Sequence, residues 1–469
     1  FGTMTVADVL EPAIGYARRG YPVLPSIART IGTVAELFAQ HWTTSAAVYL
    51  PGGSVPAVGT RMSNPTLADT YERIVRAAQG PSREAAIAAA RDAFYRGFVA
   101  EAVDAFVRVP AMDTSGDAHG GVLCAADLAA FEVPVEDPVT YDFGRYTVAK
   151  TGPWGQGPVF LQQLALLAGV DLTAFAPDDP ELVHTVVECA KLAFADREAF
   201  YGDVADVPLD ALLSSSYNDE RRALIGRKAS GDLRPGSPDG RVPCLPTLDL
   251  DAGGTVGAGE PTVQVEPAVD SQGATRGDTC HVDVVDRWGN MVSATPSGGW
   301  LQSSPVIPSL GFGLGTRAQM FWLDEGLPNS LAPGKRPRTT LSPSLALRDG
   351  EPHLAFGTPG GDQQDQWQLQ FFLFHAVYGL NLQEAIDAAT WHTAHFPSSF
   401  YPRERTPRSV LIEDRVGAGA IAALRQRGHE VSAVDGWSLG RLSAVSRSPD
   451  GVLRAGANPR GAQGYAAGR

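Results

Sequence analysis

One stretch of this chain decides its fold: Asp278-Thr279-Cys280-His281-Val282-Asp283-Val284-Val285-Asp286. From Thr279 onward, polar and apolar residues alternate as they do in a β-strand with one buried face. The turn 287–290 follows, so residues 279–286 and 291–295 are predicted to pair as a hairpin. Just before this strand, residues 231–277 are rich in Pro, Gly, Asp and Ser, which predicts an exposed connector. Thr279 therefore lies where an accessible segment meets a rigid strand.

The composition indicates a folded, acidic protein. Of 469 residues, 44% are hydrophobic and 19% are charged, and the formal net charge is -14. Such a chain lacks the basic surface that nucleic-acid binding needs. No apolar run approaches the roughly 20 residues of a membrane-spanning helix. The four cysteines are scattered without a Cys-x-x-Cys pair, which argues against a zinc site and against a disulfide scaffold. The compartment stays open.

Apolar periodicity predicts a chain of mixed helices and strands. Helices are expected over residues 6–19, 82–107, 181–200, 364–378, 382–389 and 419–427, and another after the Gly/Pro-rich loop 152–158. Besides the hairpin, strands are expected over residues 146–150, 344–347 and 354–356.

Several motifs resemble, in chain order, those of the γ-glutamyltransferases. The stretch that begins at Asp278 resembles the start of that family's small subunit. Two later segments resemble its Ser-Ser-x-Ser-Pro and Gly-Ser-Pro-Gly-Gly motifs: Thr339-Thr340-Leu341-Ser342-Pro343 and Gly357-Thr358-Pro359-Gly360-Gly361. Three earlier segments resemble its large subunit: Phe1-Gly2-Thr3-Met4, 190–197 and Tyr201-Gly202-Asp203. The resemblance covers essentially the whole chain.

The resemblance implies an α+β fold, the four-layer αββα sandwich of N-terminal-nucleophile hydrolases, made as a precursor that cleaves itself. Residues 1–278 would form the large-subunit-like part and residues 279–469 the small-subunit-like part. The match begins inside the large subunit, so we expect the family's N-terminal portion to be missing from this sequence. The two fragments would stay associated as a heterodimer, because each holds only part of a shared core. The resemblance implies no metal and no organic cofactor.

The chemistry expected at Thr279 follows from its residue type. A threonine hydroxyl is a weak nucleophile near neutral pH and needs a base beside it. Cleavage between Asp278 and Thr279 would free an α-amine on the nucleophile itself, with a reference pKa of about 7.7–8.0. That amine can take the hydroxyl proton, so one residue would supply both nucleophile and base.

The resemblance also assigns roles to other positions. Gly360 and Gly361 would form the oxyanion hole, and Ser297 matches a family threonine whose hydroxyl supports the nucleophile. The acyl group of a small amide or γ-glutamyl substrate would be contacted by Gln319, Thr339 and Thr340.

The sequence departs from the family where the glutamyl group is held. Gly299 stands at the position of an asparagine and Trp322 at that of an aspartate, both of which bind the substrate ammonium. The arginine that binds the α-carboxylate would precede Phe1. Replacement of the family's aspartate by Trp322 should weaken γ-glutamyl binding and favour a flatter or less polar acyl group. Residues 295–300 resemble the oxamate-amidohydrolase branch, which gives the first alternative. An uncleaved, non-catalytic homologue is the second alternative. The sequence does not decide whether the acyl group is transferred to water or to another acceptor.

Other motifs were weighed against this interpretation. The segment 436–440 fits Gly-x-Ser-x-Gly, but no histidine follows His429 to complete a serine-esterase triad. The segment 311–315 contains three glycines, but the third is not at the spacing that a dinucleotide-binding loop requires. His392 and His395 are spaced to share a helical face but lack a third zinc ligand. His281, beside Thr279, is either a hydrogen-bonded strand histidine or an aid to maturation.

Overall fold

The computed structural model describes residues 2–113, 115–247, 279–298, 301, 303–315, 317–400, 403–460 and 464–468. The chain forms two compact units. Of the described residues, unit 1 comprises 2–113, 115–135, 301 and 303–315, and unit 2 comprises 136–247, 279–298, 317–400, 403–460 and 464–468.

Unit 1 is mainly helical. Its helices are α1 (Val6–Arg19), α2 (Pro25–Gln40), α3 (Thr43–Tyr49), α4 (Pro65–Ala77), α5 (Arg83–Tyr95), α6 (Phe98–Val107) and α7 (Ala125–Ala130), with a 3-10 turn η1 (Pro51–Gly53). Short strands pair as β1 (Tyr21–Pro22) with β2 (Arg61–Met62) and β3 (Ala111–Met112) with β4 (Ala118–His119).

The helix predicted over residues 6–19 is confirmed, but the single helix predicted over residues 82–107 is wrong. Ser82 caps α5, because its side chain accepts a hydrogen bond from the Ala85 N–H. This helix ends at Tyr95, before Gly97. Gly97 is the N-cap of α6, with an extended backbone that a continuous helix cannot contain. Helical periodicity continued across this break because both helices bury the same kind of apolar residue.

The later segment of unit 1 explains the glycines of 311–315. Asn64 donates to the Gly311 carbonyl at 2.7 Å, and Thr70 donates to the Leu310 carbonyl at 2.9 Å. Gly311 has a positive φ of 78°, and a Cβ there would lie 2.5 Å from the Leu67 nitrogen. Gly311 therefore allows this loop to approach α4 closely, which agrees with rejecting a dinucleotide loop.

Unit 2 is built on a six-stranded sheet in the order β15-β14-β10-β9-β6-β5, with every pairing antiparallel. Its strands are β5 (Val139–Phe143), β6 (Tyr146–Lys150), β9 (Ser344–Arg348), β10 (Glu351–Gly357), β14 (Ser443–Arg447) and β15 (Leu453–Ala457). β6 pairs with β9, so segments from both sides of Thr279 in the sequence share one sheet.

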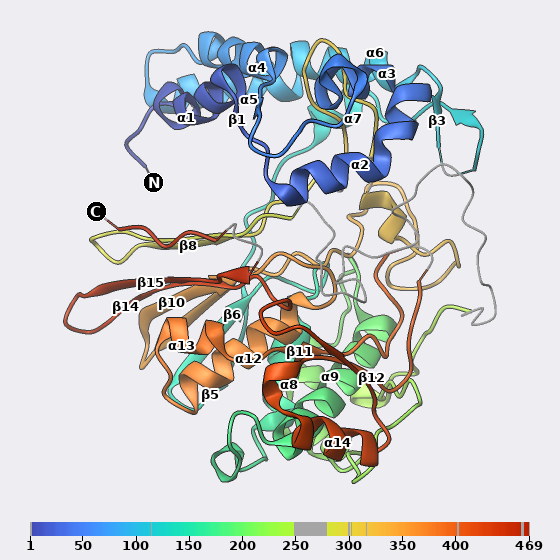
Figure 1. Cartoon of the computed structure of the whole chain (residues 1–469), viewed down its shortest axis with the longest axis vertical. Helices are drawn as coiled ribbons and strands as arrows, with labels where there is room; N and C mark the ends of the chain where they lie inside the picture. The colour runs from blue at the N-terminus through green and yellow to red at the C-terminus, as the bar shows by residue number, and fades with distance from the viewer. Residues whose placement is uncertain are drawn as a thin grey trace. The chain divides into compact units, whose positions relative to one another are not determined.

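A hairpin of β7 (Val282–Val285) and β8 (Met291–Ala294) packs against this sheet (Figure 1). The Ser293 hydroxyl donates to the Phe356 carbonyl of β10 at 3.2 Å and accepts from the Ser344 N–H at 3.3 Å. The His281 ring lies against Gly357, where an added Cβ would come within 2.2 Å of it. The predicted hairpin is confirmed and forms a second β layer on the sheet.

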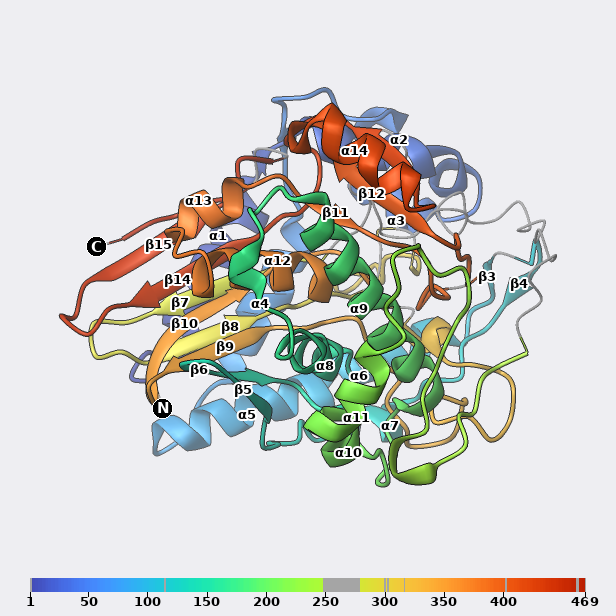
Figure 2. The ribbon, with the colours of Figure 1, turned by 90° about the horizontal axis from the view of Figure 1, so that it is seen from below.

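Helices cover the other face of the sheet (Figure 2). The helices of unit 2 are α8 (Gly157–Leu167), α9 (Pro180–Phe200), α10 (Leu209–Leu213), α11 (Ser215–Arg222), α12 (Gln364–Ala376), α13 (Leu382–Asp387) and α14 (Ala418–Gln426). Its 3-10 turns are η2 (Leu172–Ala174), η3 (Pro238–Gly240), η4 (Arg317–Met320) and η5 (Asp414–Val416). Every residue of α8 is buried because the sheet, α9 and α12 all pack against it.

The expected strands and helices of unit 2 are confirmed to within a few residues. The sequence analysis missed a sheet of β11 (Trp391–His392), β12 (Ser409–Glu413) and β13 (Glu430–Val434), in which β12 and β13 are parallel. The described part of the predicted connector, residues 231–247, is mostly exposed or partly exposed. Within it the Gly236 N–H donates to the buried Asp196 carboxylate at 2.6 Å, which anchors this point to α9.

A buried ion pair joins the sheet to α12. The Lys150 ammonium lies 2.9 Å from the Asp365 carboxylate, and both side chains are fully buried. The Ser342 hydroxyl also donates to Asp365, at 2.6 Å. Burial lowers the pKa of Lys150 and raises that of Asp365, while the opposite charge of each partner resists the shift.

Lys150→Met is expected to destabilise the fold by about 3–5 kcal/mol, because it leaves the Asp365 carboxylate buried without its cation. Lys150→Met/Asp365→Leu should recover part of this loss, since both charges are removed. Urea unfolding measures the effect. Arg145→Met breaks the exposed pair with Asp349 and is the matched control, with no measurable change expected. An unchanged unfolding midpoint in Lys150→Met would count against this role.

Gly357→Ala is expected to displace the hairpin, because the new methyl group would overlap the His281 ring. We expect a loss of about 1–3 kcal/mol in the free energy of unfolding, the usual cost of overpacking. Gly419→Ala in α14, where an added Cβ meets nothing within 4 Å, is the control. Equal unfolding free energies for the two variants would show that the hairpin does not need this contact.

Candidate active site

The hairpin brings Thr279 and Ser297 together. The Cys280 N–H donates to the Pro296 carbonyl at 3.1 Å and so continues the pairing of β7 with β8. The Thr279 hydroxyl donates to the Ser297 Oγ at 3.2 Å. Both residues are partly exposed, which leaves the hydroxyl pair open to a small molecule. The fold thus brings together two residues that lie 18 apart in the sequence.

Arg317 is a third member of this cluster, and the sequence analysis missed it. Its guanidinium donates to the Ser297 Oγ, so the serine oxygen receives a hydrogen bond from each side. The available signal was a lone cation two positions before Gln319, in a segment already assigned to the acyl group.

His281 is a hydrogen-bonded strand histidine. Its Nδ1 lies 2.8 Å from the Thr295 hydroxyl, and its Nε2 lies 2.8 Å from the Asp283 carboxylate. The Ser443 hydroxyl donates to the same carboxylate at 2.8 Å, which ties the hairpin to β14. Because both ring nitrogens are engaged, this geometry favours a structural role over that of a base.

The loop with Gly360 and Gly361 leads from β10 into α12. Gly360 has a φ of 130°, and a Cβ there would lie 3.0 Å from the Trp367 ring. The Gln364 side chain donates to the Gly360 carbonyl, and the Gln156 side chain donates to the Gly361 carbonyl at 3.4 Å. In a trans peptide the N–H points opposite to the carbonyl, so the Gly361 N–H points away from Gln364.

Asp362 anchors this loop in the interior. Its carboxylate accepts the Arg197 guanidinium, the Ser399 N–H at 2.8 Å and the Ser399 hydroxyl at 2.6 Å. Although burial opposes ionisation, Arg197 and the bonds from Ser399 hold the pKa of Asp362 below its usual value. The Asp362 carboxylate therefore stays ionised, and its hydrogen bonds hold the loop in place.

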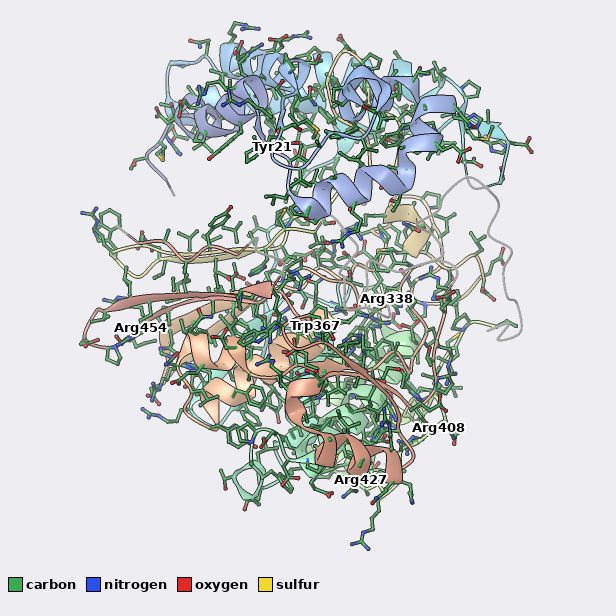
Figure 3. All side chains as sticks on the ribbon, in the orientation of Figure 1. Tyr21, Arg338, Trp367, Arg408, Arg427 and Arg454 are labelled. Carbon is green, nitrogen blue, oxygen red and sulfur yellow. The ribbon has the colours of Figure 1, made fainter. Side chains whose placement is uncertain are left out.

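The segment with Thr339 and Thr340 is held by the same helix, α9. Arg338, labelled in Figure 3, donates to the Glu198 carboxylate at 2.7 Å and to the Arg197 carbonyl at 3.0 Å. The Thr339 N–H donates to the Trp154 carbonyl at 2.9 Å. Both threonines are buried, with exposed fractions of 8% and 1%.

Gln319 lies in η4, and a partly buried arginine fixes the loop around it. Arg403 donates to the Gln319 carbonyl at 2.9 Å and to the Phe321 carbonyl at 2.7 Å. Its guanidinium lies 4.4 Å from the centre of the Trp322 ring. Burial lowers the pKa of Arg403 to about 10, which leaves it charged near neutral pH. Trp322 itself is buried, at 8% exposure.

The predicted site residues fall into two clusters. Thr279 and Ser297 form the first, with Arg317. The loop of Gly360 and Gly361 and the threonine segment form the second, since Gln364 donates to the Gly360 carbonyl and also accepts from the Ser342 N–H at 3.3 Å. The hairpin links the clusters, because it packs on β10, whose last residue leads into the glycine loop. Asp278 and Gly299 lie outside the described residues.

The two other histidines of the sequence analysis do not share a helix. His392 is in β11 and His395 follows it in a loop, so the expectation of a common helical face is wrong. The His395 Nε2 donates to the Asp232 carbonyl at 3.0 Å, and its Nδ1 accepts from the Arg408 N–H at 3.1 Å. Burial lowers the pKa of each histidine to about 3, so both are neutral.

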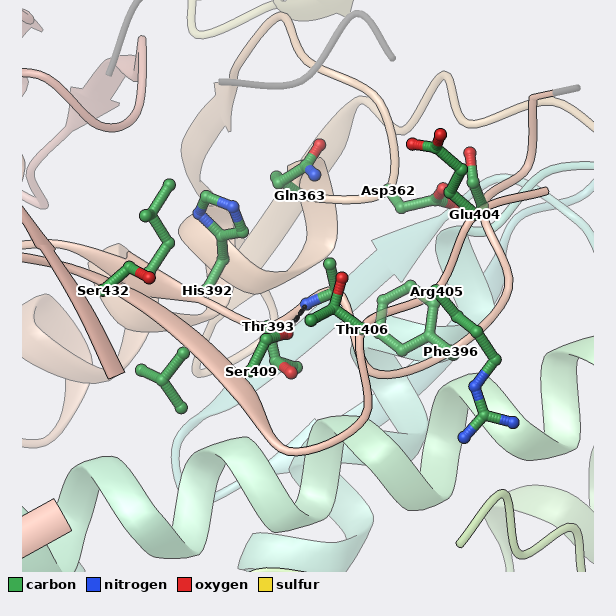
Figure 4. A pocket seen from close by; sticks show the side chains of 14 residues that line it. Asp362, Gln363, His392, Thr393, Phe396, Glu404, Arg405, Thr406, Ser409 and Ser432 are labelled. Atoms are coloured by element: carbon green, nitrogen blue, oxygen red, sulfur yellow. Dashed lines mark hydrogen bonds between the residues drawn. The ribbon is translucent and has the colours of Figure 1, made fainter. Parts of the chain in front are cut away.

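His392 lines a cavity of about 270 Å³ between the β12–β13 sheet and the start of α12 (Figure 4). Asp362, Gln363, Ser409 and Ser432 are also on its wall, and the Ala394 N–H donates to the Ser409 hydroxyl at 3.0 Å. The described lining includes none of the residues predicted to bind or react with substrate.

One group in the described part of the chain has donors close enough for a metal ion: His184, Glu188 and His429. The two rings are hydrogen-bonded to each other at 2.8 Å. Glu188 is already paired with Lys191 at 2.6 Å and with Arg234 at 3.2 Å. Because these cations neutralise the carboxylate, the donor set fits a buried polar network better than a metal site.

Ser438 has no esterase geometry. It lies in an exposed loop between β13 and β14, where its hydroxyl donates to the Asp435 carbonyl at 2.6 Å. A nucleophile elbow joins a strand to a helix, and this loop joins two strands.

A search of the described helices finds none with the length and apolar character that crossing a bilayer requires.

Known proteins resemble this chain over nearly its whole length. A family model described as Gamma-glutamyltranspeptidase matches residues 1–468. The Acylase ACY 1 proenzyme of a Pseudomonas species is 30% identical over 458 residues, which cover 97% of this chain and 70% of that protein. The oxamate amidohydrolase proenzyme of Klebsiella pneumoniae is 30% identical over 471 residues, which cover 99% of this chain and 76% of that protein.

A solved structure of an LmbA2991 variant matches with a TM-score of 0.92 and 57% identity, covering 100% of this chain and 79% of that one. Other relatives carry the name glutathione hydrolase. The relatives are thus hydrolases, and the curated ones are named as proenzymes. The chain belongs to the gamma-glutamyltranspeptidase family of N-terminal-nucleophile hydrolases.

Proposed function

We propose that this chain is a self-processing amide hydrolase in which Thr279 is the nucleophile. The observation that carries the proposal is the hydrogen bond from the Thr279 hydroxyl to Ser297 at the start of the hairpin. This bond fixes the side chain of Thr279 and orients its oxygen. The family membership supports amide hydrolysis with autoprocessing, and the first cluster supplies a threonine in the position that such chemistry needs.

In maturation, the Thr279 Oγ attacks the Asp278 carbonyl carbon, and the peptide C–N bond breaks to give an ester. Water then opens the ester and restores the hydroxyl, which leaves a free α-amine on Thr279. In turnover the amine accepts the hydroxyl proton as the oxygen attacks the substrate amide. The leaving amine takes that proton, and water hydrolyses the acyl-enzyme. Transfer to a second amine is the alternative fate of the same intermediate.

The second cluster supplies the remaining functions of this proposal. The N–H groups of Gly360 and Gly361 stabilise the negative oxygen of the tetrahedral intermediate, and the inward bonds of their carbonyls hold them in place. Thr339, Thr340 and Gln319 contact the acyl group. The anchoring of both loops to α9 supports this arrangement, because preorganised donors stabilise the intermediate without rearranging first.

The proposal includes a heterodimer of the fragments 1–278 and 279–469 and the four-layer αββα sandwich. β6 pairs with β9 across the proposed cleavage boundary, so separating the fragments would expose a long sheet edge. The hairpin, the sheet and the helices of unit 2 supply the successive β, β and α layers.

Thr279→Ala is expected to abolish maturation and to lower kcat/KM for amide substrates by at least about 1,000-fold, because nucleophile and base are both lost. Thr279→Ser should mature and keep part of the activity. Ser438→Ala, in the exposed loop, is the control and should match the parent protein. Amide turnover by Thr279→Ala at the parental rate would remove Thr279 from the mechanism.

Ser297→Ala is expected to lower kcat about 3- to 10-fold, the usual effect of losing one neutral hydrogen bond to the nucleophile. Ser297→Thr keeps the hydroxyl and should retain most of the rate. Steady-state kinetics on the matured variants measure both. If Ser297→Ala matures and turns over substrate as fast as Ser297→Thr, the bond to Thr279 contributes nothing to catalysis.

A further inference from the structure

The position of Arg317 points to the kind of acyl group that the site takes. Its guanidinium donates to the Ser297 Oγ, which also accepts from the Thr279 hydroxyl at 3.2 Å. The cation is therefore only two hydrogen bonds away from the nucleophile oxygen. All three residues are partly exposed, so a small substrate at the nucleophile meets this cation.

The protein holds this cation in a fixed place. Arg317 begins η4, and its guanidinium lies 5.8 Å from the centre of the Phe400 ring. The same turn is tied down by Arg403, which donates to the Gln319 and Phe321 carbonyls. Those bonds and its stacking on Trp322 commit Arg403 to the loop. Arg317 is thus the cation bonded to the nucleophile's partner.

The charge beside Ser297 comes from Arg317. Residues 317–323 contain this one cation, Asp324 and Glu325 follow the stretch, and Trp322 within it is a buried aromatic residue. The Arg317 guanidinium would repel an ammonium group on the acyl chain and attract a carboxylate. A guanidinium has a planar fork of five N–H donors, so it can bind a carboxylate while it bonds Ser297.

We infer that Arg317 binds a carboxylate on the acyl group, and that the substrates are monoamides of short dicarboxylic acids without an ammonium group. The carboxylate would lie one to three bonds from the acyl carbon, since the cation is close to the nucleophile. This inference rests on the proposed function. Thr279 forms an ester with the acyl carbon, and the amide C–N bond breaks. The nitrogen leaves as ammonia or an amine with the hydroxyl proton, and water releases the dicarboxylate.

The test compares substrates that differ only in charge. The matured protein is assayed with oxamate, malonamate and succinamate, and with the matching neutral diamides oxamide, malonamide and succinamide. We expect kcat/KM for at least one monoanion to exceed that of its diamide roughly 10- to 100-fold, the usual range for a hydrogen bond to a charged group. A γ-glutamyl anilide should be the poorer substrate.

Arg317→Met should remove this preference, because kcat/KM should fall more for the monoanions than for the diamides, chiefly through KM. Arg317→Lys should keep part of the preference, because it keeps the charge but loses the fork. Arg287→Met, on the exposed turn of the hairpin, is the matched control and should behave as the parent protein. Mass spectrometry confirms that each variant has matured before it is assayed.

Several outcomes would overturn the inference. Equal use of monoanions and diamides by the parent protein would do so, as would a preference that survives in Arg317→Met. If Arg317→Met does not mature, the comparison of parent with Arg317→Lys decides by the same criterion. If no amide is turned over, calorimetry with oxalate, malonate and succinate replaces the rates, and absence of binding refutes the role of Arg317. Failure to mature at Thr279 in the parent protein would instead refute the proposed function.

Discussion

The buried ion pair between Arg197 and Asp362 is the contact on which the site depends. Arg197 extends from α9, and Asp362 directly follows Gly360 and Gly361. Neither charge is exposed enough to be solvated, so each needs the other. Glu198 accepts from Arg197 at 2.7 Å and from Arg338 at 2.7 Å, which extends the network to the threonine segment. One turn of helix thus sets the positions of both loops.

This network gives a physical reason for motifs that lie far from the nucleophile. The segment 190–197 ends in the arginine of the pair. Beyond it, Gly202 lies so close to the Pro328 carbonyl that an added Cβ would be 2.0 Å away. Asp203 accepts from the Arg336 backbone and side chain, each at 2.8 Å. The upstream part of the chain therefore acts as a template on which the downstream loops are fixed.

Much of this arrangement was open to prediction from the sequence. Alternation after Thr279 identified the hairpin, and helical periodicity identified α1, α9, α12 and α14, because each pattern reports which residues face a core. The break at Gly97 was missed, since periodicity is blind to backbone angles. The β11–β13 sheet was missed as well, because β11 is only two residues long and β12 pairs in parallel with β13 across α14, so no hairpin turn marks the pairing.

The candidate site, like the fold, was predicted only in part from the sequence. Thr279, Ser297 and the glycine loop were predicted as site residues because spaced motifs mark them. Arg317 was not found, because its importance comes only from the fold, which places its guanidinium against the Ser297 hydroxyl. The zinc alternative at His392 and His395 rested on spacing alone. The structure instead puts the two rings in a strand and a loop, where burial keeps both neutral.

Intact-mass spectrometry with N-terminal sequencing of the purified chain tests the central claim most directly. The account predicts two fragments that remain together under native conditions, and the smaller one begins Thr-Cys-His-Val. A chain that stays whole, or a new N-terminus at any residue other than Thr279, would contradict it.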